Sequence, residues 1–469
     1  MSADTRPKSA INRLGQVMSR LAGRFVPSPF VLAVLLTLLV LALAVTTGQA
    51  VAQLPMAERL NKVLIGGWGG ALFGAGGLQF AFQMVLVLVT GYAFALSPPI
   101  QRLIDKLAAI PRSAAQASAV VALVSCVSGY IHWGLGAVAG ALLAREIGRS
   151  WAERGKALHY PLMGAAAYSG LLVWHGGLSG SAPLKVAESG HFLEKTVGVI
   201  PVDQTLFSGL NLVVTVSLII TTVLVYYLLT PRNEADCVPF SGPTRSASPK
   251  LVKVAKGDGT QHPIIAALED SLVIPALLGG LCLAYVGHAF VTQGFKALNL
   301  NTVNLFFLAA GLLLHGSPRS YGRAAADGAK GAVGIVLQFP LYFGILGMLK
   351  ASGLIVQLSD FFVSISNATT FPIFAYLSAG LVNLFVPSGG GQWAVQGPVL
   401  MNAAKELGLD PSKAIMALAY GDAWTNMLQP FWALPLLGIM GLKARDIIGY
   451  TTILFGIAAP VTIFWLLVL

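Results

Sequence analysis

The sequence predicts an all-α, polytopic membrane protein built from two inverted repeats, each with a re-entrant hairpin and an interrupted helix. Three observations lead to this fold class. Only 10% of the 469 residues are charged and 55% are hydrophobic, whereas a soluble domain carries about 25% charged residues. Apolar runs long enough to cross a bilayer recur along the chain. Two further apolar regions contain glycine-rich breaks and resemble each other.

The N-terminal segment, residues 1–29, is polar and basic. Arg13, Arg20 and Arg24 are interleaved with apolar residues, a pattern typical of an amphipathic helix on a membrane surface. We expect this segment to lie on the cytoplasmic face.

Candidate crossings follow from length, because a spanning helix needs about 20 apolar residues. The unbroken candidates are 30–47, 79–97, 206–230, 271–293, 302–316, 333–350 and 447–469. Two more candidates, 160–182 and 413–440, are long enough but interrupted by polar residues. The regions 114–145 and 371–405 each contain a central break, and we interpret them as hairpins. The fold is therefore expected to have about nine crossings plus two hairpins.

The positions of the basic residues predict the orientation. With the N-terminus inside, 22 of the 30 Lys and Arg residues fall in inner segments and 8 in outer segments. Cytoplasmic loops of membrane proteins are enriched in Lys and Arg, so we expect a cytoplasmic N-terminus and an external C-terminus. The same rule explains the basic excess without nucleic acid as a partner. The charges fix the sides of the loops and not the depth of the hairpins.

These features divide the chain into five parts. After segment 1–29 come a first repeat at 30–230, a cytoplasmic linker at 231–269, an extra spanning helix at 270–300 and a second repeat at 301–469. The linker is rich in Pro, Ser and Lys, a composition typical of flexible connections.

The two halves resemble each other around their hairpins. Residues 126–148 align without gaps to residues 386–408, with six identical positions among 23. Matching blocks upstream and downstream keep the same order. The charge-derived topology opens the first hairpin to the cytoplasm and the second to the outside, so the halves are inverted. Inverted repeats with interrupted helices are typical of secondary transporters, which bind near the bilayer midplane.

The stretch "NLFVPSGGGQWAVQGP", residues 383–398, breaks a helix at membrane depth. Such backbone must be buried in protein or line a wet cavity, where the N–H groups of a glycine tip can bind an anion. The serines and glycines at both tips are therefore candidate ligands. The alternative is that small residues only let helices pack closely.

That stretch, the earlier "SGYIHWGLG" and "AYGDAWTNMLQPFWALPLLG" at 419–438 resemble the bacterial short-chain fatty acid transporter family of acetoacetate and butyrate uptake systems. The resemblance covers the chain from about residue 12 to 469. It implies a small monocarboxylate as substrate and the bacterial inner membrane as location. The family is similar to a superfamily that includes divalent anion/sodium symporters, which implies a scaffold, a moving transport domain and a homodimer. Those proteins carry Ser-Asn-Thr at the tips, where this chain has Ser-Gly-Gly-Gly.

Polar residues near the breaks complete the candidate site. His132 and Gln392 follow the tip serines by four residues, so each could reach back to its own tip; a purely structural role is the alternative for His132. Trp133, Trp393 or Phe385 could line the pocket for the substrate tail. The substrate-binding candidates are Ser128, Gly129, His132, Asn383, Ser388, Gly389, Gly390, Gly391, Gln392, Trp393, Thr425 and Asn426.

Asp422 is the only acid deep in a predicted crossing, and intramembrane acids face cavities or partners. It could bind Na+, carry a proton, or pair structurally with a basic residue or His175. Thr425, Asn426 and Gln429 follow Asp422 at helical spacing, which predicts one polar helix face. We interpret Asp422, His175 and Gln429 as ion-coupling candidates.

The leading hypothesis is a secondary active importer of small monocarboxylates, coupled to H+ or Na+ by alternating access. The sequence has no GxxxxGK[ST] motif, so ATP is not expected to drive it, and no cofactor is expected. A passive anion channel is the alternative. An intramembrane enzyme using His132, His175 and Asp422 is a third reading, which no HExxH or GxSxG motif supports.

Overall fold

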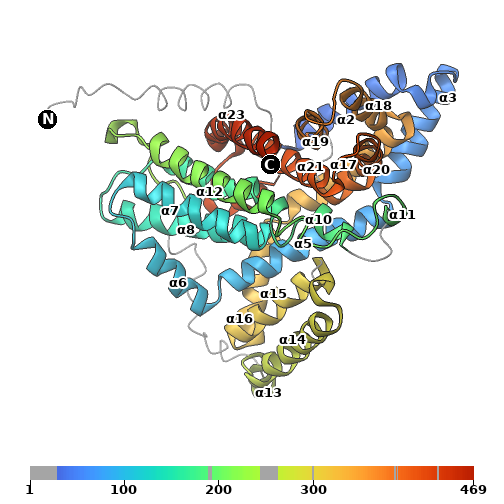
Figure 1. Ribbon diagram of the computed structural model, residues 1–469. Coiled ribbons are helices and arrows are strands. Elements are labelled where there is room, and N and C mark those ends of the chain that lie inside the picture. The colour runs from blue at the N-terminus through green and yellow to red at the C-terminus, as the bar shows by residue number, and fades with distance from the viewer. Residues whose placement is uncertain are drawn as a thin grey trace.

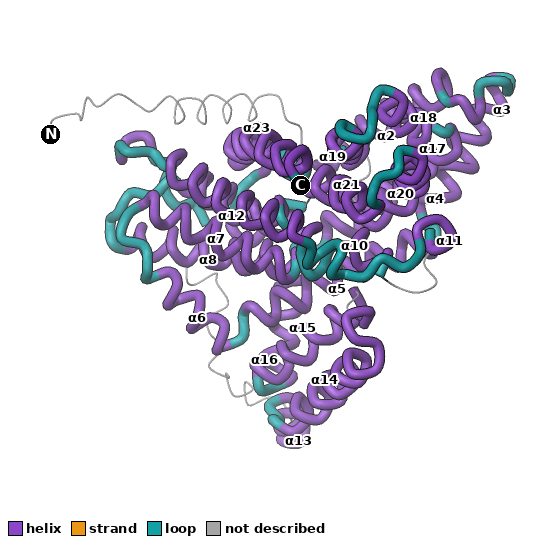
Figure 2. The backbone as a smooth tube through the Cα atoms, in the orientation of Figure 1, coloured by secondary structure: helices purple, strands orange, loops and turns teal. Residues whose placement is uncertain are grey.

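The helices of the computed structural model follow the predicted apolar runs (Figure 1). Only helices and loops occur among the described residues (Figure 2), which confirms the all-α fold class. The structure describes residues 29–187, 193–242, 262–297, 300–384, 387, 389–429 and 432–469. The amphipathic helix predicted in the N-terminal segment falls outside these residues.

The first half contains one long helix for each unbroken run and a hairpin between them. Its main helices are α2 (Pro29–Thr47), α5 (Ala75–Ala95), α6 (Pro98–Ala108), α7 (Ala114–Ile131), α8 (Trp133–Glu153), α9 (Tyr160–Tyr168), α10 (Ser181–Val186), α11 (Glu194–Val197) and α12 (Gly209–Leu229). The segment between α2 and α5 is also helical, as α3 (Met56–Leu60), η2 (Asn61–Gly69) and α4 (Gly70–Leu72). The candidate crossings 30–47 and 79–97 left this segment outside the predicted helices. Gly67 lies so close to Gly347 that neither position has room for a side chain, which holds this segment against α17 (Val333–Ser352).

The second half begins with four helices, α13 to α16, and then has α17, α18, a hairpin and a broken helix in the order of α5 to α10. Its helices are α13 (Pro263–Glu269), α14 (Val273–Gln293), α15 (Leu300–His315), α16 (Pro318–Lys330), α17, α18 (Leu354–Ser364), α19 (Phe371–Asn383), α20 (Gly389–Glu406), α21 (Pro411–Thr425), α22 (Leu434–Met440) and α23 (Ala444–Val468). Helices α15 and α16 pack on α5, and with α14 they form the lobe at the bottom of Figure 1.

Local sequence explains where these helices begin and end. The Ser113 and Ser317 side chains cap α7 and α16 by accepting backbone N–H bonds, and Asp410 does the same for α21. Helix α17 ends at Gly353 and α22 at Gly441, with φ of 78° and 68°. Glycine adopts this left-handed conformation without steric cost.

Five helices among the described residues are long and apolar enough to cross a membrane: α7, α12, α13 joined to α14, α17 and α23. Helices α5 and α6 together would add a sixth span, bent by 73°. The total of about nine crossings, the inversion of the repeats and the domain boundaries stay predictions.

Each half contains a helical hairpin followed by a broken helix. In the first hairpin, Gly136 lies against Gly129 and Gly140 against Ser125, which is the pairing of antiparallel legs around His132. Helix α9 then continues through two short 3-10 turns, Ser169–Leu172 and Trp174–Gly176, before α10. In the second half, α19 and α20 form the hairpin and α21 and α22 the broken helix.

The beginning of the linker is folded onto the helices. The Tyr160 N–H donates to the Val238 carbonyl at 2.9 Å, and the Val238 N–H donates to His159 Nδ1 at 2.9 Å. His159 Nε2 therefore carries the proton of the neutral ring and donates to the Tyr450 hydroxyl at 2.6 Å. Burial lowers the pKa of His159 to about 4, against a smaller raising effect of Asp236.

This contact predicts a pH-dependent stability. The ordinary histidine pKa is about 6.5, so the unfolded chain binds a proton at His159 between pH 6.5 and 4 while the folded chain does not. Stability should fall as the pH drops through this window, by up to about 3 kcal/mol, and not change above it. Melting temperatures of purified protein and His159→Gln should converge as the pH falls from 7.5 to 4.5. A constant difference between the two proteins would contradict the prediction.

Candidate functional site

His132 forms the bend of the first hairpin. Its extended backbone (φ −160°, ψ 124°) ends α7, and its Nδ1 accepts the Leu135 N–H at 3.4 Å to cap α8. A neutral ring then carries its proton on Nε2, and this buried atom has no hydrogen-bond partner among the described residues. His132 is 2% exposed. The bend thus presents one unused N–H donor.

The first bend is fastened to the break of the first interrupted helix. The Leu178 N–H donates to the Tyr130 carbonyl at 2.7 Å, and the Trp133 N–H donates to Ser179 Oγ at 3.2 Å. A Cβ on Gly129 would lie 2.6 Å from the Gly170 carbonyl oxygen. Gly129 therefore allows a close approach of α7 to the first break. The half-buried Ser128 lies in the last turn of α7, and its carbonyl accepts the His132 N–H.

Asn383, the last residue of α19, joins the second hairpin to the second interrupted helix. Its Nδ2 donates to the Asp422 carbonyl, Thr425 Oγ1 and Asn426 Oδ1 at 2.9, 2.9 and 3.1 Å. Gln429 Nε2 in turn donates to the Asn383 carbonyl at 3.4 Å. Asn383 therefore brings together four candidates: Asp422, Thr425, Asn426 and Gln429.

The predicted polar helix face is wrong in one respect. Helix α21 ends at Thr425, Asn426 caps it, and Gln429 lies in the following irregular segment. The four residues do not share a helix, and Asn383 gathers them instead. Pro430 follows in the sequence, and the residue before a proline is disfavoured in helical conformation.

His175 and Asp422 connect the two halves. His175 Nδ1 lies 2.6 Å from Asp422 Oδ2, with side chains 0% and 2% exposed. The Ala182 N–H donates to His175 Nε2 at 3.1 Å, so Nε2 is the unprotonated nitrogen and Nδ1–H donates to the carboxylate. In this arrangement the histidine is neutral, and an ionised Asp422 would give the pair one buried negative charge.

The glycine tip of the second hairpin lies against His175 and Ser181. A Cβ on Gly389 would lie 2.6 Å from both His175 Cε1 and Ser181 Oγ, and 3.0 Å from Trp174. Ser181 Oγ is 3.1 Å from His175 Nε2. Gly389 begins α20, and the N–H groups of the first helical turn have no intrahelical acceptor. Gly390 and Gly391 belong to that turn, which is electrostatically suited to an anion.

Aromatic rings pack against one another between the two halves. The Trp133 ring centroid lies 4.9 Å from Trp432 and 6.5 Å from Trp174, and Trp174 stacks on His175 at 4.5 Å. The Trp174 Nε1–H is buried without a partner among the described residues. These rings join the first bend to both interrupted helices and form an apolar wall with one unused donor.

Three further candidates from the second hairpin are not part of these contacts. Ser388 lies outside the described residues. Gln392 Nε2 donates to the Ala379 carbonyl and Gln396 Oε1 at 2.8 and 2.9 Å, so it bridges the legs of its own hairpin. Trp393 is fully buried.

Near the breaks, the buried polar atoms without a partner within the described ranges include both hydrogen-bond donors and acceptors. Donors occur at His132 Nε2 and Trp174 Nε1, and acceptors at Asn383 Oδ1, Gln392 Oε1 and Gln429 Oε1. Asn383 and Gln429 stand at or just beyond the C-terminal ends of α19 and α21, where helix dipoles favour a cation. Anion donors and cation acceptors thus occur on neighbouring elements. No cluster of three His, Cys, Asp or Glu side chains occurs in the described part of the chain.

Sequence reasoning missed Ser179, Ser181 and Trp174, although all three lie in the stretch "LLVWHGGLSGSAPL" that marks the first break. Small and polar residues next to glycine at a break were the available signal. It also missed Tyr168, whose hydroxyl donates to the carbonyls of Asn426 and Gln429 at 3.0 and 2.8 Å.

Known proteins are similar to this chain over almost its whole length. Residues 10–469 match the family model described as "Short chain fatty acid transporter". A protein of Escherichia coli K12, provisionally named a short-chain fatty acid transporter, is 40% identical over 95% of this chain and 97% of its own length. A Haemophilus influenzae protein with the same provisional name is 37% identical, over 97% and 98%.

Two solved structures are similar at low sequence identity. The YdaH transporter of Alcanivorax borkumensis has a TM-score of 0.47 at 15% identity, over 94% of this chain and 97% of that one. MtrF of Neisseria gonorrhoeae has a TM-score of 0.43 at 16% identity, over 97% and 98%.

Proposed function

This chain belongs to the short-chain fatty acid transporter family, and we propose that it imports small monocarboxylates such as butyrate or acetoacetate by secondary active transport. It is a multi-pass membrane protein and a transporter, not an enzyme. The proposal adds the bacterial inner membrane, a cytoplasmic N-terminus, an external C-terminus, a homodimer and an elevator-type movement.

The observation that carries the proposal is the His175–Asp422 pair under the glycine tip. The pair joins residues 247 positions apart in the two halves, and Gly389 lies against it. A carboxylate at the first turn of α20 would meet N–H donors from Gly390 and Gly391, with Trp133, Trp174 and Trp432 beside its aliphatic tail. A few fixed donors and an apolar pocket are sufficient for a ligand of this size.

The same geometry supports coupling to a cation. A substrate carboxylate near the buried Asp422 would be repelled by it. At about 6 Å and an effective dielectric constant of about 20, two like charges repel by about 3 kcal/mol. A cation that neutralises the pair would remove this repulsion and raise substrate affinity by about a hundredfold. Substrate and cation would therefore bind together, as symport requires.

Each candidate ion has a position of its own. A proton would bind to the His175–Asp422 pair. Sodium prefers oxygen ligands, and Asn383 Oδ1 and Gln429 Oε1 are buried oxygens without a partner among the described residues. Asn383 Nδ2 also donates to the Asp422 carbonyl. The two ions can be distinguished because sodium would need the Asn383 and Gln429 amide oxygens and a proton would not.

Uptake of radiolabelled butyrate and acetoacetate into proteoliposomes tests this function. We expect accumulation above the outside concentration when an inward H+ or Na+ gradient is imposed, one ion at a time, and none without a gradient. Uptake that never exceeds equilibrium, together with large single-channel currents, would instead support a passive anion channel. Absence of uptake of any short monocarboxylate would contradict the proposal.

A further inference from the structure

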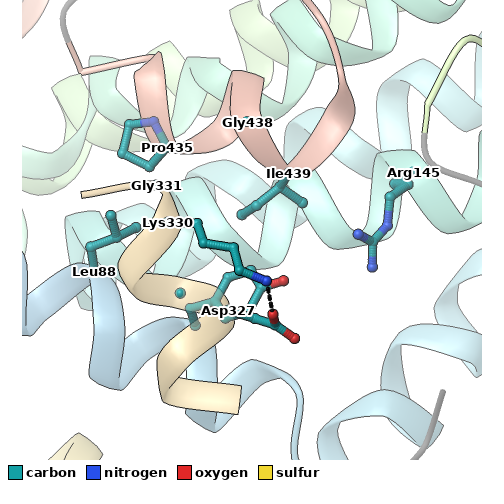
Figure 3. Close-up of a pocket in the computed structure, with 10 residues that line it drawn as sticks. Leu88, Arg145, Asp327, Lys330, Gly331, Pro435, Gly438 and Ile439 are labelled. Carbon is teal, nitrogen blue, oxygen red and sulfur yellow. Dashed lines mark hydrogen bonds and ion pairs between the residues drawn. The ribbon is translucent and has the colours of Figure 1, made fainter. Parts of the chain in front are cut away.

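A cavity of about 230 Å³ lies away from the glycine tips, at the far end of α8 (Figure 3). Arg145 contributes from α8, and it follows Trp133 at the first bend by twelve residues. At 1.5 Å per residue the two positions are about 18 Å apart. The lining residues are Leu88, Tyr92, Arg145, Asp327, Gly328, Lys330, Gly331, Pro435, Gly438 and Ile439. The cavity therefore lies where α5, α8, α16 and α22 meet, outside the site described above.

The charges of this cavity leave one cation uncompensated. Lys330 Nζ and Asp327 Oδ1 pair at 2.5 Å within α16, and Figure 3 shows Arg145 across the cavity from them. No carboxylate of the described residues forms an ion pair with Arg145. The next arginine on the helix, Arg149, pairs with Glu146 and Glu153. Arg145 is half-buried and interacts with the Tyr92 hydroxyl, while the nearby Asp327 is paired with Lys330. A guanidinium that is not paired with a carboxylate attracts an anion.

The rest of the lining fits the tail of a short carboxylic acid. Leu88, Pro435 and Ile439 supply apolar surface, and Gly328, Gly331 and Gly438 leave room. The volume is below the range of roughly 300–1,000 Å³ that drug-sized ligands occupy, which suits an acid of a few carbons. The guanidinium can hold a carboxylate through two parallel N–H bonds.

We propose that this cavity is a second binding site for a short-chain carboxylate, with Arg145 as the main residue that binds the carboxylate group. The choice of carboxylate rests on the proposed function. Arg145 and Lys330 belong to segments with a predicted cytoplasmic location, so the occupant is the imported acid after release. An acid bound there bridges α8 and α22 to α5 and α16. Accumulated product can then hold these helices in the present arrangement and slow further import.

Fluorine NMR tests this site with trifluorobutyrate and the full-length protein in phosphatidylcholine nanodiscs. We expect two bound signals for the wild type and loss of one signal, or at least tenfold weaker binding, in Arg145→Gln. The matched control Arg149→Gln should keep both signals, because that arginine is already paired. Arg145→Lys should retain the second site with weaker binding. Asp327→Asn should tighten it several-fold by removing a nearby negative charge.

Absence of any bound signal that Arg145→Gln removes or weakens, or equal spectra for Arg145→Gln and Arg149→Gln, would overturn the proposal. Adding phosphatidylglycerol to the nanodiscs distinguishes a free acid from a lipid headgroup. The proposal fails if phosphatidylglycerol binds through Arg145 and trifluorobutyrate does not bind there in its absence. The result is independent of transport, since Arg145-dependent binding is measured without a gradient. Failure of uptake with a positive binding result would therefore refute the proposed function alone.

Discussion

Asp422→Asn should reduce gradient-driven accumulation of butyrate by tenfold or more while exchange of labelled for unlabelled butyrate continues. The amide oxygen of asparagine can still accept the His175 Nδ1–H bond, which spans 2.6 Å in the wild type. The helices should therefore keep their arrangement. The buried negative charge disappears, and with it the reason for a cation to bind together with the substrate.

Proteoliposome accumulation and counterflow, measured on the same preparations, check this prediction. Asp360→Asn is the control, because this acid lies exposed on α18 and its removal changes the net charge equally. Normal accumulation in Asp422→Asn would show that the pair has only a structural role. Loss of both accumulation and exchange with normal folding would show that Asp422 is needed for substrate binding itself.

Gly389→Ala should lower transport by tenfold or more, and Gly390→Ala should leave it near the wild-type rate. A Cβ at Gly389 would meet His175 and Ser181 at 2.6 Å, so the tip would have to move away from the pair. At Gly390 the nearest atom, Ser181 Cβ, is 3.7 Å away, which is an ordinary contact. Both substitutions change helix propensity in the same way, so their difference isolates the contact with the pair.

Initial rates and apparent KM for butyrate, normalised to folded protein in the membrane, check the comparison. Equal rates for the two variants would mean that the tip does not need to rest on His175. A large loss in Gly390→Ala would mean that backbone freedom of the glycine run, rather than its contact, is what transport requires.

Local features of the fold could be predicted because they depend on local sequence. Apolar runs and glycine-rich or polar breaks predicted the positions of the long helices, the two hairpins and the two broken helices. The unexpected helical segment at 56–72 depends on packing between Gly67 and Gly347. These residues are 280 positions apart, and their contact leaves no local pattern in the sequence.

The candidate site was predictable in its residue types and less so in its contacts. Asp422 and His175 stood out as polar groups in apolar segments, and their pairing was one of several open alternatives. Ser181 and Trp174 became candidates only once the second tip was located against them. The expected helix face through Gln429 failed because periodicity alone does not show where a helix ends. The depth of the hairpins and the inversion of the repeats are defined relative to the membrane. Contacts within the chain do not show where the membrane lies.

A density map of the protein in nanodiscs saturated with butyrate tests the convergence of the two halves on one substrate most directly. The account predicts a carboxylate at the first turn of α20, within hydrogen-bond distance of the glycine N–H groups and beside the His175–Asp422 pair. Density for the acid elsewhere in the chain, with the glycine tip empty or separated from His175 by lipid or bulk water, would contradict it.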